Sequence, residues 1–315
     1  MSWLMEITFP VSGVTTSPLL PFLVALVVSF FTSMGGVSGA FLLLPFQVSI
    51  LGFTSPAVSP TNLVFNCVAI PSGVYRYIRE GRMAWPLTWV VILATLPGVF
   101  LRAIIRIKYL PDPKAFKLFA GCVLLYIGGR LLYDMVRPHQ SSAALEAKFK
   151  EQVAVRRQES QSRLAAGLPP EAVVRTLAFS LGRITFEFYG ETFSFSTWGI
   201  FLLSFIVGVV GGTYGIGGGA IIAPFFVAVF GLPVYTVAGA ALMGTFITSV
   251  FGVIFYVAIA PWYPHLAVAP DWLLGLLFGL GGAAGMYCGA RAQKCVPARI
   301  IKLILAFMII FLAAN

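Results

Sequence analysis

The chain has 315 residues, of which 59% are hydrophobic and only 10% are charged. A soluble domain of this length could not remove so much apolar surface from water, so lipid must be the solvent for most of the chain. The net charge of +10 would suggest nucleic-acid binding in a soluble protein. Here the 21 Lys and Arg residues lie mainly at the ends of apolar runs and in one polar loop, which membrane topology explains.

Apolar runs follow one another along the chain, and a spanning helix needs ~20 residues. We expect helices at about 19–34, 37–53, 58–78, 84–105, 114–133, 197–212, 216–231, 235–258, 271–290 and 299–314. The first two runs, and the pair that begins at residue 197, are too short for comfortable spanning helices.

Glycines interrupt each short pair, at Gly35 and Gly36 in the first half and between Gly211 and Gly219 in the second. We interpret each pair as a helical hairpin that enters the membrane and turns back at its glycines. The alternative is one long broken helix in each half.

The distribution of positive charge favours the hairpins. With hairpins and an external N-terminus, 16 of the 21 Lys and Arg residues lie inside, whereas the single-crossing alternative gives 12 inside and 9 outside. Each half then contains a hairpin and three spanning helices, an odd number of crossings. The second half is therefore expected upside down relative to the first, and the two hairpin tips approach each other from opposite faces.

This interpretation predicts an all-α polytopic membrane protein built from two inverted pseudo-repeats, with a small α/β insert. The first transmembrane repeat is expected at 1–133, a cytoplasmic linker or insert at 134–194, and the second transmembrane repeat at 195–315. Within the insert, the composition predicts a helix over 141–165 and a β-hairpin or meander over 173–196.

The two halves also repeat each other in sequence. Residues 36–77 align without a gap on residues 215–256, at an offset of 179 positions, and eleven residues coincide. Two glycine-broken hydrophobic segments in corresponding positions are typical of secondary transporters, whose binding site lies where the halves meet.

The glycine breaks are the strongest candidate binding elements. A helix start leaves backbone N–H groups without partners and with partial positive charge, and glycine lets a ligand approach the backbone. Two such starts meeting at the midplane would bind an anion without any Lys or Arg. The alternative is that the glycines only allow tight helix packing. The candidates in the breaks are Gly36, Ser38, Gly39, Gly215, Gly217, Gly218 and Gly219.

Polar side chains on the helices that follow the breaks add to the candidates. They are Thr61, Asn62 and Asn66 in the first half, and Thr245, Thr248 and Ser249 in the second. Asn66 and Thr245 occupy equivalent positions of the repeat. An unpaired Asn is costly in an apolar span, so these side chains must face protein or water. Helix-to-helix hydrogen bonds remain an alternative to ligand contact.

Other chemistries have little support. The Cys and His residues have no metal-ligand spacing, so no metal or cofactor is expected. The string from Gly36 to Gly39 matches the GxSG pattern of intramembrane serine proteases, but both His139 and His265 are expected in loops, away from Ser38. The chain is therefore not expected to be an enzyme. No Asp or Glu lies well inside a predicted span, so the sequence does not identify a coupling ion.

The glycine-rich run from Gly215 through Pro224 to Gly231 and Pro233 resembles the sulfite exporter TauE/SafE family of membrane permeases. The segment that starts at Gly36 is similar to the family's first repeat, although Ser and Ala at positions 38 and 40 replace glycines. The resemblance implies transport of sulfite, sulfonates or related small anions across the bacterial cytoplasmic membrane.

We therefore expect a secondary transporter, an exporter or permease, that works by alternating access, and the alternative is a passive anion channel. The expected partners are a small anionic substrate and the lipid bilayer, without nucleic acid, and association of identical chains stays open. Both chain ends are expected outside and residues 134–194 in the cytoplasm.

Overall fold

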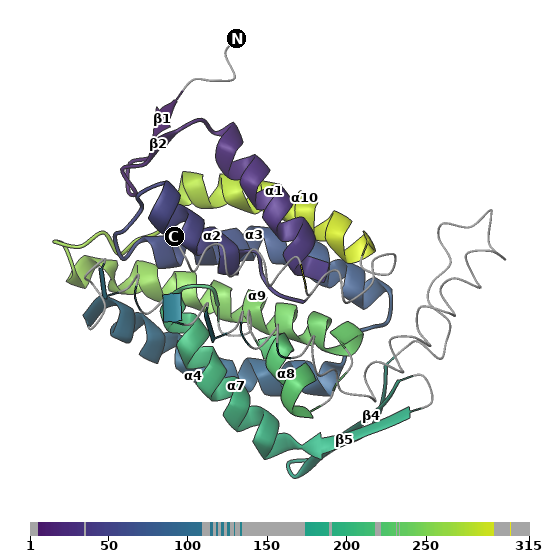
Figure 1. The fold of residues 1–315 in the computed structure, drawn as a ribbon. Helices are drawn as coiled ribbons and strands as arrows, with labels where there is room; N and C mark the ends of the chain where they lie inside the picture. The colour runs from purple at the N-terminus through teal and green to yellow at the C-terminus, as the bar shows by residue number, and fades with distance from the viewer. Residues whose placement is uncertain are drawn as a thin grey trace, which may run out of the picture.

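The computed structural model describes residues 6–34, 36–108, 174–188, 191–217, 222–230 and 234–292, together with Leu232, Leu303 and scattered positions between 114 and 133. Most of these residues are helical, and two small sheets lie at the periphery of the helices (Figure 1). The predicted helices at 141–165 and 299–314, and most of the one at 114–133, lie outside the described residues.

The helices of the first half begin and end close to the predicted positions. They are α1 (Leu19–Met34), α2 (Ala40–Pro45) with its π-helical continuation (Phe46–Ile50), α3 (Val58–Arg79) and α4 (Trp85–Lys108). Pro45 has no N–H to donate, and the chain continues in the wider turn directly after it.

The second half has the same order of helices. They are α7 (Thr197–Tyr214), α8 (Ile222–Phe230), α9 (Val234–Ile259) with a 3-10 turn (Ala260–Trp262), and α10 (Trp272–Ala292). Two helical stretches of the described residues, Thr236–Trp262 and Trp272–Ala292, are long and apolar enough to cross a membrane.

The predicted β-meander is confirmed. Strands β3 (Arg175–Phe179), β4 (Arg183–Phe188) and β5 (Glu191–Ser196) pair antiparallel in sequence order. The backbone N–H of Val174 donates to the carbonyl of Gly81 at 3.1 Å, which ties this sheet to the turn between α3 and α4. We call this end of the molecule the sheet end.

A second, two-stranded sheet was not predicted. Strands β1 (Ile7–Thr8) and β2 (Thr15–Thr16) form a hairpin at the opposite end, which we call the hairpin end (Figure 1). The Asp271 carboxylate, just before α10, accepts hydrogen bonds from the backbone N–H and the hydroxyl of Ser12 at 3.0 and 2.9 Å. These hydrogen bonds join residues 259 positions apart, so no local sequence pattern predicts them.

Helices of the two halves alternate in space. α1 packs along α10, and α7 packs along α4, while α3 and α9 pack together between these pairs (Figure 1). The offset of 179 residues carries α1 onto α7 and α4 approximately onto α10, so these contacts are equivalent in the two halves. The halves therefore bury their apolar surfaces mainly against each other.

Glycines on α10 allow this close packing. A Cβ added to Gly281, Gly285 or Gly289 would collide with backbone carbonyl groups of α1. Small residues at every fourth position let two helix backbones approach in a membrane. On another face of α10, a Cβ at Gly279 would lie 2.6 Å from the Cβ of Val68 on α3.

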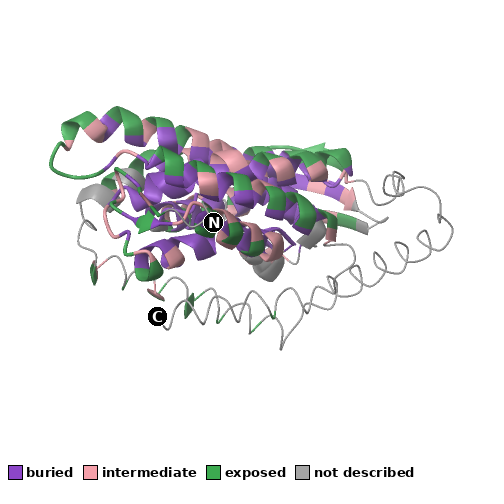
Figure 2. Cartoon of the chain, turned by 90° about the horizontal axis from the view of Figure 1, so that it is seen from above, coloured by how far each residue is buried: buried purple, intermediate pink, exposed green. Residues whose placement is uncertain are grey.

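The outer faces of the helices are apolar and exposed, while the inner faces are buried (Figure 2). On α7, every fourth residue of one stripe is exposed, from Trp198 at 65% through Leu202 and Ile206 to Val210. Such a continuous apolar stripe fits contact with lipid.

We predict that Gly285→Leu prevents stable folding, because its side chain would have to displace the backbone of α1. We expect the free energy of unfolding to fall by more than about 2 kcal/mol. The measurement is the fraction of protein that stays monodisperse in detergent as the temperature rises. Gly129→Leu is the matched control, since no atom of the described residues lies within 4 Å of a Cβ at Gly129. Equal stability of the two variants would contradict the packing described here.

Candidate functional site

Both glycine breaks end their helices with the same hydrogen-bonded turn. Gly36 and Gly215 have φ angles of +70° and +93°, which only glycine adopts without strain. The N–H of Val37 donates to Thr32 and that of Ile216 to Gly211, both to carbonyls five residues earlier. This is the Schellman arrangement, formed at equivalent positions of the repeat.

Each break is inserted into the opposite half. A Cβ on Gly36 would lie 2.6 Å from the Cβ of Ala238 on α9, and one on Gly215 would lie 2.6 Å from the hydroxyl of Ser59 on α3. Ser59 and Ala238 are themselves 179 residues apart and hence equivalent. The two tips therefore occupy matching positions about a common centre.

Asn66 on α3 joins both breaks at this centre. Its side-chain Oδ1 accepts a hydrogen bond from the Ser38 hydroxyl in the first break. Its Nδ2 donates to the carbonyl of Ile216 in the second break at 2.9 Å, and to Oγ of Ser249 on α9 at 3.2 Å. One buried amide thus connects four segments of the chain, and we call Ser38, Asn66, Ile216 and Ser249 the central cluster.

Gly217 completes the wall of the central cluster. It has a φ of +91°, and a Cβ there would lie 2.8 Å from Cγ2 of Thr245 and 3.0 Å from Oγ of Ser249. Its equivalent in the first half is Ser38, which does carry a side chain. The absence of one at Gly217 is what makes room for the Ser249 and Asn66 side chains.

The structure thus brings together Ser38, Asn66, Gly217, Thr245 and Ser249. Gly36 and Gly215 belong to the same two breaks but contact Ala238 and Ser59 instead. Gly218 and Gly219 lie outside the described residues.

Three other residues that the sequence predicted for the site contact groups outside the central cluster. The Thr61 hydroxyl donates to the carbonyl of Ala57 and accepts from the backbone N–H of Asp271 at 2.9 Å, so it belongs to the hairpin end. The Thr248 hydroxyl bonds back to the carbonyl of Gly244 on its own helix. A Cβ on Gly39 would lie 2.6 Å from the Ser29 hydroxyl on α1.

Asn62 pairs with a residue that sequence reasoning missed. Its Oδ1 accepts from Nε2 of Gln47 at 2.8 Å, and its Nδ2 lies 3.4 Å from the carbonyl of Ala40. Gln47 was overlooked because it stands alone in an apolar run, although an isolated amide in such a run is itself a signal. Ser59 was also missed, since a small hydroxyl residue carries no distinctive pattern.

Water is excluded from the central cluster in this conformation. The side chains of Ser38, Asn66, Thr245 and Ser249 are fully buried. Among the described residues, the buried charged side chains lie at the two ends of the molecule. Asp271 is at the hairpin end, and Glu80 at the sheet end contacts both Arg76 at 2.6 Å and Arg82 at 2.5 Å.

The described residues contain no group of three or more His, Cys, Asp or Glu side chains that could hold a metal ion. The chemistry at the central cluster is therefore that of amide, hydroxyl and backbone groups. Such groups can exchange hydrogen bonds with an oxygen-bearing ligand, and in a medium of low dielectric these bonds are stronger than in water.

Comparison with known proteins gives one family. The model of the family described as "Sulfite exporter TauE/SafE" matches residues 21–315. Searches of curated proteins and of solved structures found no match.

We predict that Gly36→Ala is far more damaging than Gly52→Ala. Both glycines have φ near +70°, so alanine costs about 1 to 2 kcal/mol at either position. Only at Gly36 does the new Cβ also meet the Cα of Ala238, at 2.7 Å, whereas nothing lies within 4 Å at Gly52. Thermal unfolding of the two purified variants measures the difference, and equal midpoints would show that the tip is not tightly inserted.

Proposed function

The chain belongs to the sulfite exporter TauE/SafE family of membrane permeases, and we propose that it carries sulfite, sulfonates or related small anions by alternating access. The single observation that supports a site is the meeting of both glycine breaks at Asn66. Secondary transporters of several folds bind their substrates where two broken helices meet between repeats.

The proposed binding step exchanges hydrogen bonds within the central cluster. The Ser38 hydroxyl now donates to Asn66 Oδ1, and Asn66 Nδ2 donates to Oγ of Ser249 and to the carbonyl of Ile216. An anion that separates the two breaks would instead accept hydrogen bonds from the Ser38 and Ser249 hydroxyls and from Asn66 Nδ2. Hydrogen bonds to a charged acceptor are roughly twice as strong as neutral ones, which offsets the loss of the contacts within the protein.

The proposed site contains no Lys or Arg among its described residues. A buried Lys or Arg side chain would bind an anion strongly and slow its release. Release is as necessary as binding for a transporter, and dipoles of neutral groups allow both.

The proposed alternation between an outward-open and an inward-open state depends on the contacts that each glycine break makes with the other half. Since each break is inserted into the opposite half, a rocking of one half against the other moves the second break relative to Asn66 and Ser59, and the first break relative to Ala238. Inverted repeats would make the two open states equivalent in energy to a first approximation. In this proposal the repeats are inverted in the bacterial cytoplasmic membrane, with residues 134–194 in the cytoplasm and both chain ends outside.

A passive channel for the same anions is distinguished by flux measurements. In proteoliposomes, a carrier should give uptake that saturates with substrate concentration and is accelerated by unlabelled substrate on the opposite side. Ohmic single-channel currents without such counterflow would exclude alternating access.

We predict that Ser249→Ala raises KM for anion counterflow about five-fold, because one hydrogen bond of about 1 kcal/mol is lost. Asn66→Ala should abolish counterflow, since it leaves the Ser38 hydroxyl and the Ile216 carbonyl without their shared partner. The control is Thr95→Val, which removes another buried hydroxyl, bonded only to carbonyls of its own helix.

Thermal unfolding of each variant separates loss of fold from loss of transport. Ser249→Ala with unchanged KM, in protein that remains folded, would argue against the central cluster as the binding site.

A further inference from the structure

We infer that Ser59 and Gln47 form a second polar position, between the central cluster and the hairpin end, through which the anion and its water reach Asn66. This inference rests on the proposed function, but it concerns residues outside the central cluster. It is supported by two buried side-chain oxygen atoms that have no hydrogen-bond partner among the described residues.

The first is the hydroxyl of Ser59. Its side chain is fully buried, and its Oγ has no hydrogen-bond partner among the described residues. It lies beside the glycine break of the opposite half, 2.6 Å from where a Cβ of Gly215 would stand. A buried hydroxyl without a partner destabilises the protein, and no described residue supplies one, so we infer that a bound ligand or water molecule does.

The second is the amide oxygen of Gln47. The Gln47 side chain is also fully buried, and its Nε2 donates to Oδ1 of Asn62. Asn62 is oriented by its own Nδ2, which faces the carbonyl of Ala40. The Gln47 Oε1 is therefore left as an acceptor that no described group satisfies.

These groups form a track along α3. Ser59, Asn62 and Asn66 are spaced three and four residues apart and so share one face of the helix. At a rise of 1.5 Å per residue, Ser59 lies about 10 Å from Asn66, towards the hairpin end. Ser55, just before α3, contributes another buried hydroxyl oxygen without a partner among the described residues.

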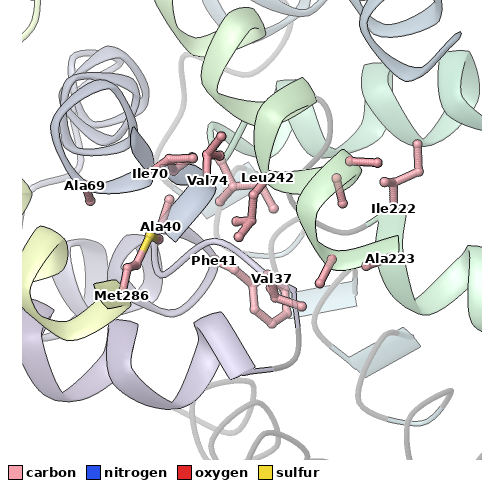
Figure 3. Packing of buried hydrophobic residues seen from close by; sticks show 14 of the residues in the cluster. Val37, Ala40, Phe41, Ala69, Ile70, Val74, Ile222, Ala223, Leu242 and Met286 are labelled. Carbon is pink, nitrogen blue, oxygen red and sulfur yellow. The ribbon is translucent and has the colours of Figure 1, made fainter. Parts of the chain in front are cut away.

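In the opposite direction the next two turns of the same face of α3 are apolar. Ile70 and Val74 follow Asn66 on α3, and they belong to the same buried cluster as Leu242 of α9 and Met286 of α10 (Figure 3). All four are buried. An anion would find hydrogen-bond partners between Asn66 and the hairpin end but none along these apolar turns, so the route that we infer leads to the hairpin end.

The two unpartnered groups define the ligand's chemistry. A serine hydroxyl can donate to an oxyanion, whereas the Gln47 oxygen can only accept. Together they suit an oxyanion that arrives with a bound water molecule, or one that keeps an acidic proton.

The test is thiol accessibility in protein whose four native cysteines are replaced by serine. Ser59→Cys and Val74→Cys are compared for reaction with a negatively charged methanethiosulfonate reagent added to one side of the membrane at a time. We expect Ser59→Cys to react at least about ten-fold faster than Val74→Cys, and only when the reagent is added on the side of the hairpin end. Methanesulfonate should slow this reaction. A rate no higher than that of Val74→Cys would overturn the inference.

A second variant covers the case in which the introduced thiol prevents folding. Ser59→Ala should raise KM for counterflow about three- to ten-fold at unchanged kcat, the equivalent of one lost hydrogen bond. It should not lower the thermal midpoint, because it removes a hydroxyl that has no partner among the described residues. An unchanged KM, or a lowered midpoint, would overturn the inference.

The two proposals fail separately. Anion counterflow by the cysteine-free protein together with an unreactive Ser59→Cys variant would refute the polar position alone. A reactive variant in protein that shows no counterflow with sulfite or any sulfonate would leave the polar position in place and refute the proposed function.

Discussion

The whole arrangement depends on how closely two backbone segments approach helices of the other half. Gly36 and Gly215 touch Ala238 and Ser59 at distances that no side chain would permit. Glycine also supplies the positive φ that ends each helix and turns the chain towards the centre. A single property, the lack of a Cβ, therefore ends the helices, brings the breaks to one place and lets the halves interlock.

This close approach determines the chemistry of the centre. Since the tips exclude lipid and water, polar groups there must find partners within the protein, and Asn66 supplies them for both halves at once. The charged groups Asp271, Glu80 and Arg82 are buried as well, but they lie at the two ends, where ion pairs and hydrogen bonds within the protein hold them. The molecule thus has a neutral, hydrogen-bonded centre between two charged ends, which is compatible with a ligand that must leave as readily as it arrives.

Stability and function are in tension around this centre. The oxygens of Ser59 and Gln47 would be better replaced by apolar groups if folding were the only requirement. The apolar block of Val74 and Leu242 on the other side satisfies packing fully. We interpret the contrast as a difference between a side whose polar groups can accept the anion and a side that apolar packing closes.

The sequence alone determined most of the described helices to within a few residues, because each apolar run is a local property and each break is marked by its glycines. It predicted the meander at 173–196 for the same reason, and the duplication identified Asn66 and Thr245 as equivalent positions. Only the tertiary structure decided which polar groups meet. Asn66 reaches Ile216 across 150 positions, while Thr61, on the same helix, turns to Asp271 instead. The periodicity of a helix fixes the face on which a side chain lies, but the packing of the other half decides what that face contacts.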